Sequence, residues 1–119
     1  MITVTSGGMY TQKLDLDDLQ CETLDPFDGV TAYAQNKRAQ VLLTETWAER
    51  LAPHGVTANA MHPGWADTPA VQTSLPTFRK ITGPFLRDWE QGADTLVWLA
   101  VAEKVGETSG ELFLDRKIR

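Results

Sequence analysis

The sequence predicts an α/β fold in which a small parallel sheet is covered by helices. Its 119 residues alternate between three short apolar segments and two long helical segments, in the order strand, helix, strand, helix, strand. Such alternation joins neighbouring parallel strands through right-handed crossovers. Hydrophobic residues make up 42% and charged residues 23% of the chain, as expected of a soluble globular domain or part of one.

The first strand is predicted at Met1–Thr5, where β-branched residues predominate until Ser6-Gly7-Gly8 ends the run. The polar, acidic segment that follows carries turn signals at Pro26 and Asp28-Gly29. We expect a surface loop there, with one short turn around Asp15–Gln20.

The strongest helix signal is at Thr31–Leu51, a segment without Gly or Pro that is rich in Ala, Leu, Gln, Glu and Arg. Thr31 is the expected N-cap, and Pro53 and Gly55 end the helix. Val56–Met61 then has the composition of a second strand.

A second helix is predicted after an irregular segment, 68–87, which contains three prolines and one glycine. Asp88 and Gln91 have the spacing of a capping box, and the helix should extend to about Ala102. Its apolar face is expected to contain Ala93, Leu96, Val97 and Ala100.

The carboxyl end is predicted to form the third strand, at Leu112–Leu114, after a turn bracketed by Gly106 and Gly110. The last five residues, Asp115–Arg119, are mostly charged. We interpret them as a solvated tail and not as a binding arm.

Composition excludes several classes of protein. The net charge of −5 and the pI of about 4.9 argue against nucleic-acid binding. Cys21 is the only cysteine, so an internal disulfide is impossible and a reducing, cytoplasmic compartment is expected. No stretch of 18 apolar residues occurs, so we expect no transmembrane segment.

Tyr33 and Lys37 carry the clearest chemical signal. They are four positions apart on the predicted helix, so their side chains share one face. An ammonium beside a phenol stabilises the phenolate, which suits a general acid or base. Ser6, at the end of the first strand, lies where an open α/β sheet binds ligands and can orient a carbonyl oxygen. The alternative is an amphipathic helix in which the Tyr packs and the Lys is solvated.

Other sites are poorly supported. His54 and His62 are eight positions apart and lack the further ligands that a metal site needs. We therefore interpret His62 as a hydrogen-bonded residue at a strand end. A hydrolase is not indicated, because the Gly-x-Ser-x-Gly motif is absent.

Three blocks together resemble the carboxyl-terminal half of a short-chain dehydrogenase/reductase. They are Ile2-Thr3-Val4-Thr5-Ser6, Tyr33-Ala34-Gln35-Asn36-Lys37, and Asn59-Ala60-Met61-His62-Pro63-Gly64 with Thr68. A finer resemblance, to one subfamily, rests on Ser6-Gly7-Gly8-Met9, Tyr33–Arg38, His62–Pro69, Gln91-Gly92-Ala93-Asp94-Thr95 and Asp115-Arg116-Lys117.

The resemblance implies roles for seven residues. Ser6 would position the carbonyl or alcohol, Tyr33 would transfer the proton, and Lys37 would bind the ribose of the nicotinamide nucleotide. The loop beside the nicotinamide would contain Pro63, Gly64 and Trp65, and Thr68 would contact the carboxamide or the adjacent phosphate. The implied cofactor is NADP or NAD. The implied substrate is a small carbonyl or alcohol, a hydrophobic one by analogy with the retinol-dehydrogenase-like branch.

The resemblance also implies a partial Rossmann-like, doubly wound sheet: the last three strands with their crossover helices. Residues 1–119 would be the catalytic half of the domain, without the cofactor-binding half, since the sequence contains no Gly-x-Gly-x-x-Gly turn. The first strand would then lie at an unpaired edge. Homodimers or heterodimers would form through the helix around Thr31–Leu51.

Three hypotheses about the protein follow. The chain is the catalytic half of an oxidoreductase, or it is a short form that is inactive alone and pairs with a full-length relative. The third hypothesis, a self-contained small binding domain, leaves apolar sheet faces uncovered.

Overall fold

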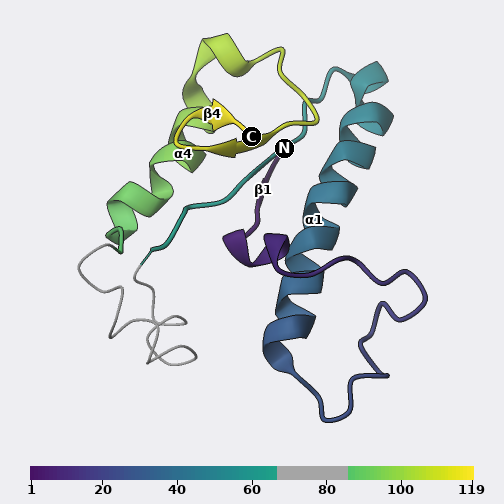
Figure 1. Cartoon of the computed structure of the whole chain (residues 1–119). Coiled ribbons are helices and arrows are strands. Elements are labelled where there is room, and N and C mark those ends of the chain that lie inside the picture. The colour runs from purple at the N-terminus through teal and green to yellow at the C-terminus, as the bar shows by residue number, and fades with distance from the viewer. Residues whose placement is uncertain (67–85) are drawn as a thin grey trace.

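The computed structural model describes residues 1–66 and 86–119 (Figure 1). Four strands and two long helices form its framework, and three short 3₁₀ helices connect them. In chain order these are β1 (Ile2–Val4), η1 (Gly7–Tyr10), α1 (Gly29–Leu51), η2 (Ala52–His54), β2 (Asn59–Met61), α4 (Trp89–Val101), η4 (Glu103–Val105), β3 (Leu112–Leu114) and β4 (Lys117–Ile118).

The sheet has the strand order β1-β2-β3-β4, and β1, β2 and β3 run parallel. Ile2 pairs with Asn59, and Ala60 pairs with Leu112. This arrangement confirms the predicted α/β class, with β1 at the edge of the described sheet. β2 is shorter than predicted, because it begins at Asn59 and not at Val56.

Helices α1 and α4 cover opposite faces of the sheet (Figure 1). Successive side chains on a strand point to opposite faces, so Ala60 and Met61 belong to different clusters. Ala60 packs with Val41 of α1 and with Met9. Met61 packs with Phe113, and Leu96 and Leu99 of α4 join that second cluster.

Helix α1 begins two residues earlier than predicted, and its N-cap is Asp28, not Thr31. The Asp28 carboxylate accepts hydrogen bonds from the backbone N–H groups of Val30 (2.9 Å) and Thr31 (3.3 Å). The Thr31 hydroxyl also donates to this carboxylate, at 2.6 Å. A carboxylate accepts several such bonds at once, so it caps better than a hydroxyl three positions later.

The loop before α1 turns around Asp18, close to the predicted Asp15–Gln20 turn. The Asp18 carboxylate accepts hydrogen bonds from the backbone N–H groups of Glu22 (2.8 Å) and Thr23 (2.9 Å). Cys21, inside this turn, is buried as a free thiol. The turn therefore fixes a segment that otherwise has no regular secondary structure.

The predicted capping box of α4 is confirmed. The Gln91 N–H donates to the Asp88 carboxylate at 2.7 Å, and the Gln91 side chain accepts from the Asp88 N–H at 3.1 Å. The predicted apolar face is confirmed at Leu96, which packs on the second cluster. It was wrong at Val97 and Ala100, which are exposed, and Gly92 and Thr95 are the buried positions. Small residues face inwards there because Gly92 lies close to Ala66, 3.2 Å from where its own Cβ would be.

The charged end of the chain is exposed, as predicted, but it is not a free tail. It turns at Asp115 and Arg116 and returns as β4, antiparallel to β3. Both turn residues have positive φ, of 54° and 58°, as a two-residue hairpin of type I′ requires. Side chains other than Gly adopt this conformation at a cost of about 1 kcal/mol each, so other contacts must hold the turn.

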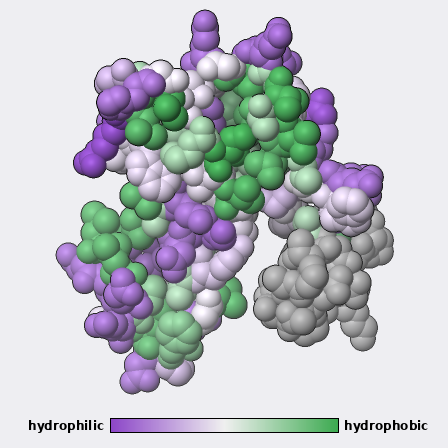
Figure 2. All heavy atoms as spheres, turned by 180° about the vertical axis from the view of Figure 1, so that it is seen from behind, coloured by the Kyte–Doolittle hydropathy of each residue, from purple (hydrophilic) through white to green (hydrophobic). Residues whose placement is uncertain are grey.

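Apolar side chains remain exposed along both helices. Hydrophobic atoms gather over the sheet and α4 on the face shown in Figure 2, and Val97 and Val101 of α4 are exposed. Leu43 and Trp47 of α1 are exposed as well. No described helix is both long and apolar enough to cross a membrane.

Candidate active site

The candidate site lies at the carboxyl ends of β1 and β2, where parallel α/β sheets bind their ligands. Ser6 follows β1, and the loop Pro63–Trp65 follows β2. η1 lies against the second strand end, because the Tyr10 and His62 rings meet edge to face with centroids 6.0 Å apart. The sheet thus brings together residues that are more than 50 positions apart in the sequence.

Ser6 and Tyr33 border the same small space beside Gly8. A Cβ atom placed on Gly8 would lie 3.6 Å from Ser6 Oγ and 3.5 Å from Cε1 of the Tyr33 ring. Ser6 Oγ accepts a hydrogen bond from the Gly8 N–H at 3.2 Å and so caps η1. The hydroxyl proton of Ser6 is not used in that bond and can be donated to a ligand.

Lys37 lies one helical turn after Tyr33 on the same face of α1. Its Nζ is 5.5 Å from the centroid of the Tyr33 ring. Nζ donates to the Val4 carbonyl at 3.3 Å and to Gln40 Oε1 at 3.1 Å, which holds the ammonium at the end of β1. The Thr5 hydroxyl donates to the Lys37 carbonyl at 2.7 Å and ties the two elements together.

The amphipathic-helix alternative does not describe these two residues. Tyr33 is 50% exposed, so it does not pack in the core. Lys37 is partly buried and hydrogen-bonded, so it is not a solvated lysine. The structure therefore places Ser6 beside Tyr33, and Tyr33 beside Lys37.

His62 is buried at the end of β2, and its role as a hydrogen-bonded strand-end residue is confirmed. Its Nδ1 accepts a hydrogen bond from the Gly64 N–H at 3.3 Å. Burial lowers the pKa of His62, and the positive charge of Arg87 lowers it further. A neutral imidazole is required here, because a protonated Nδ1 has no lone pair to accept with.

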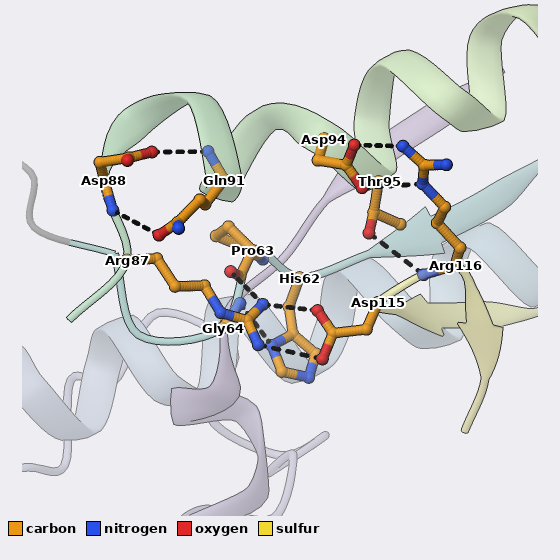
Figure 3. A network of polar contacts seen from close by, with 10 residues as sticks. All are labelled: His62, Pro63, Gly64, Arg87, Asp88, Gln91, Asp94, Thr95, Asp115 and Arg116. Atoms are coloured by element: carbon orange, nitrogen blue, oxygen red, sulfur yellow. Dashed lines mark hydrogen bonds and ion pairs between the residues drawn. The ribbon is translucent and has the colours of Figure 1, made fainter. Parts of the chain in front are cut away.

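Arg87 connects the Pro63–Trp65 loop to the hairpin between β3 and β4 (Figure 3). Its Nη1 donates to the Pro63 carbonyl at 3.0 Å. Nη1 and Nη2 also bind the Asp115 carboxylate in a bidentate pair, at 2.7 and 3.0 Å. These hydrogen bonds lower the pKa of Asp115. The backbone N–H of Arg87 donates to the Trp65 carbonyl at 2.7 Å.

A second pair holds the hairpin to α4. The Arg116 guanidinium donates to both oxygens of Asp94, and the Arg116 N–H donates to Thr95 Oγ1 at 3.2 Å (Figure 3). The hydrogen bonds lower the pKa of Asp94 and raise that of Arg116. These contacts hold the hairpin turn in place, although Asp115 and Arg116 have positive φ.

Sequence reasoning did not assign a role to Arg87, Asp115 or Arg116. The available signal was the resemblance of Gln91–Thr95 and Asp115–Lys117 to one subfamily, since the network joins these blocks. Thr68, the remaining predicted site residue, lies outside the described residues. Within residues 1–66 and 86–119, no group of three His, Cys, Asp or Glu residues is arranged to hold a metal ion.

A family model described as enoyl-(acyl carrier protein) reductase matches residues 22–116. The chain is 51% identical over 118 residues to human dehydrogenase/reductase SDR family member 12, which confirms the predicted subfamily resemblance. It is 34% identical to human retinol dehydrogenase 12 and 35% identical to a putative daunorubicin C-13 ketoreductase of Streptomyces.

These matches cover 98% of this chain but only 36%, 37% and 40% of the three relatives, so the chain spans little more than a third of their length. Among solved structures, acetoin dehydrogenase from Enterobacter cloacae superposes with a TM-score of 0.60 at 24% identity. That match covers 94% of this chain and 38% of the other. The family model and the fold together show that the chain belongs to the short-chain dehydrogenase/reductase family.

Proposed function

We propose that this chain forms the catalytic part of an NADP- or NAD-dependent oxidoreductase that interconverts a carbonyl and an alcohol. One observation carries the proposal: Ser6 Oγ and the Tyr33 ring border a common position beside Gly8, and the Lys37 ammonium lies 5.5 Å from that ring. Membership of a family of dehydrogenases and reductases supports it.

In this proposal Ser6 and Tyr33 act on the substrate oxygen. Ser6 Oγ already accepts from the Gly8 N–H, so its own proton is free to bind and orient that oxygen. The Tyr33 hydroxyl gives a proton to the oxygen during reduction and takes it back during oxidation. Because Tyr33 is half exposed, a substrate can reach it from solvent.

Lys37 would bind the ribose of the nicotinamide nucleotide. Its ammonium has three donors, and the Val4 carbonyl and Gln40 use two of them. The third is available for a ribose hydroxyl, and the loop Pro63–Trp65 would lie beside the nicotinamide. When bound, the cofactor supplies or accepts a hydride. The residues present fit the nicotinamide ribose but not the pyrophosphate, since the chain has no Gly-x-Gly-x-x-Gly turn.

The proposed substrate is a hydrophobic carbonyl or alcohol. Two relatives are named for retinol and for daunorubicin. By analogy, the half-exposed Tyr33 would meet an apolar substrate at the open side of the site.

Replacement of Tyr33 tests the proposed chemistry. We would exchange the matched 118 residues of human member 12 for this chain and measure NADPH or NADH oxidation with a panel of hydrophobic aldehydes and ketones. Tyr33→Phe should lower turnover by about 100-fold or more, because general acid catalysis typically contributes that much. The dissociation constant of the dinucleotide should stay nearly unchanged.

Tyr10→Phe is the matched control, since it removes the same hydroxyl from the only other tyrosine and keeps the ring contact with His62. It should keep full turnover. Equal activity of the Tyr33→Phe and unsubstituted proteins would remove Tyr33 from its role. Titration of the 119-residue chain itself with NADPH and NADH, followed by tryptophan quenching, shows whether this part binds cofactor alone.

A second function, pairing with a full-length relative, is favoured by the exposed apolar surface of α1. Leu43 and Trp47 lie one helical turn apart and are 46% and 36% exposed. The expected result is co-purification of a tagged chain with the full-length relative. Capture of no such partner would exclude this function.

A further inference from the structure

We propose that Arg87 is a positioning residue, which clamps the loop Pro63–Trp65 to the β3–β4 hairpin and so sets the surface that meets the cofactor. The hydrogen bonds of Arg87 to the loop and to Asp115 support the clamp directly. Its link to the cofactor rests on the proposed function.

Arg87 forms hydrogen bonds to the loop with both its backbone and its side chain. Its N–H donates to the Trp65 carbonyl at 2.7 Å, and its Nη1 donates to the Pro63 carbonyl at 3.0 Å. Gly64, between these two carbonyls, is therefore held from both sides. Figure 3 shows the guanidinium lying against this loop, with Asp115 on its far side.

Gly64 is required for this close approach. A Cβ atom on Gly64 would lie only 2.6 Å from Arg87 Nη1 and 2.8 Å from Cζ. Gly64 also has a φ of +75°, which disfavours any other side chain. An alanine there would push the guanidinium away from the Pro63 carbonyl.

Asp115 fixes the direction of the guanidinium. It binds both Nη1 and Nη2, and the planar guanidinium cannot rotate while that bidentate pair is intact. Lysine has no such fork and cannot hold one carbonyl and two carboxylate oxygens in a fixed geometry. The position of the β3–β4 hairpin therefore fixes the position of the loop, because the Arg87 side chain binds both.

Arg87 also supports the bond inside the loop. The Gly64 N–H donates to His62 Nδ1, which must be unprotonated to accept. The positive charge of Arg87 disfavours protonation of this buried ring. Removal of Arg87 therefore weakens the loop at two points.

The Arg116–Asp94 pair provides a matched comparison. It has the same chemistry and similar exposure: the side chains of Arg87 and Asp115 are 31% and 48% exposed, and those of Arg116 and Asp94 are 51% and 45% exposed. It joins the hairpin to α4, through Asp94, and not to the Pro63 carbonyl that Arg87 binds. Substitutions in either pair should lower the stability of the chain to a similar degree. Only substitutions in the Arg87–Asp115 pair should displace the loop Pro63–Trp65.

The first measurement is amide hydrogen exchange at Gly64 in the 119-residue chain. Arg87→Met and Asp115→Asn should each raise the exchange rate of this amide by about tenfold. Arg116→Met and Asp94→Asn keep the bond from the Arg116 backbone N–H to Thr95 that holds the hairpin to α4. They should therefore leave the exchange rate within about twofold of that of the unsubstituted chain. Gly64 exchange that is unchanged in Arg87→Met, or equally raised in Arg116→Met, would overturn the proposal.

The second measurement is steady-state kinetics in the chimera with human member 12. Arg87→Met should raise the KM for the dinucleotide by about tenfold with a smaller change in kcat, and Arg87→Lys should lie between. Arg116→Met should match the unsubstituted chimera. Gly64→Ala should reproduce the effect of Arg87→Met, because it displaces the guanidinium without removing it.

Asp115→Asn separates positioning from direct binding of the dinucleotide by Arg87. If Arg87 positions the loop, loss of the Asp115 charge raises the KM. If Arg87 binds a phosphate directly, a freed guanidinium lowers the KM, and the proposal is overturned. Absence of all dinucleotide turnover would refute the proposed function, while the Gly64 exchange rates would still decide whether Arg87 clamps the loop.

Discussion

At the scale of single residues, His62 links protonation to the loop that follows β2. Its folded-state pKa lies below the 6.5 of an unfolded histidine, first because it is buried and then because Arg87 is positively charged. The unfolded chain therefore binds the proton more readily. The stability that neutral His62 contributes is complete above about pH 6.5 and is lost as the pH falls below that value.

We predict that His62→Asn reduces this pH dependence. Asn Oδ1 can accept the Gly64 N–H in place of Nδ1 but does not titrate. Urea unfolding between about pH 8 and about pH 5.5 should show a smaller loss of stability in His62→Asn than in the unsubstituted chain. His54→Asn, at an exposed position in η2, is the control and should keep the original dependence. An equal loss in His62→Asn and the unsubstituted chain would contradict the prediction.

The residues of the site differ in how far sequence reveals them. The placement of Ser6, Tyr33 and Lys37 was predictable because it depends on local structure: a strand end, or a four-residue spacing on one helix. Arg87 and Asp115 meet only after β3 has paired with β2 and the hairpin has turned. That turn needs positive φ at two residues other than Gly, and although Asp favours this conformation, Arg116 gives no such signal.

At the scale of elements, the N-cap of α1 depends only on contacts between residues close together in the sequence. Asp28 was read as part of a turn with Gly29, yet its carboxylate accepts from two backbone N–H groups of the first turn. Gly29 costs little at this position, where helical hydrogen bonds have not yet begun. The Asp-Gly pair that signals a turn in the sequence is therefore the start of the helix.

We predict that Asp28→Ala lowers the melting temperature of the chain by roughly 4 °C, because two N–H groups lose their acceptor. Thr31→Ala removes only one bond to the same carboxylate and should have a smaller effect. Asp28→Asn keeps an acceptor oxygen and should lie close to the unsubstituted chain. Differential scanning calorimetry would rank the three variants, and a larger effect of Thr31→Ala would restore Thr31 as the cap.

Helix α4 shows where periodicity misleads. Its capping box was predictable from Asp88 and Gln91 alone, because both partners are local. Its buried face was predictable only in part, through Leu96, because two small residues, Gly92 and Thr95, face the loop and the hairpin. Hydrophobicity identifies a face that packs on a core, but a face that packs on backbone requires small side chains.

At the scale of the whole molecule, the described chain leaves much apolar surface uncovered. β1 lies at the edge of the described sheet, and Val4 on it is 42% exposed. The α4 side carries the hydrophobic area shown in Figure 2. An exposed sheet edge and exposed apolar helices both favour association with another chain.

We predict that association through α1 makes the stability of the chain depend on its concentration. Any partner that binds the folded chain alone raises the melting temperature by mass action, so the midpoint should rise between about 1 and about 100 μM chain. Leu43→Lys places a charge beside Trp47 on the exposed side of α1 and should abolish that rise. Glu49→Lys introduces the same side chain at another exposed position of α1 and should preserve it. A midpoint independent of concentration in the unsubstituted chain would mean that α1 does not pair, and the exposed surface over β1 and α4 would then be the place to look for a partner.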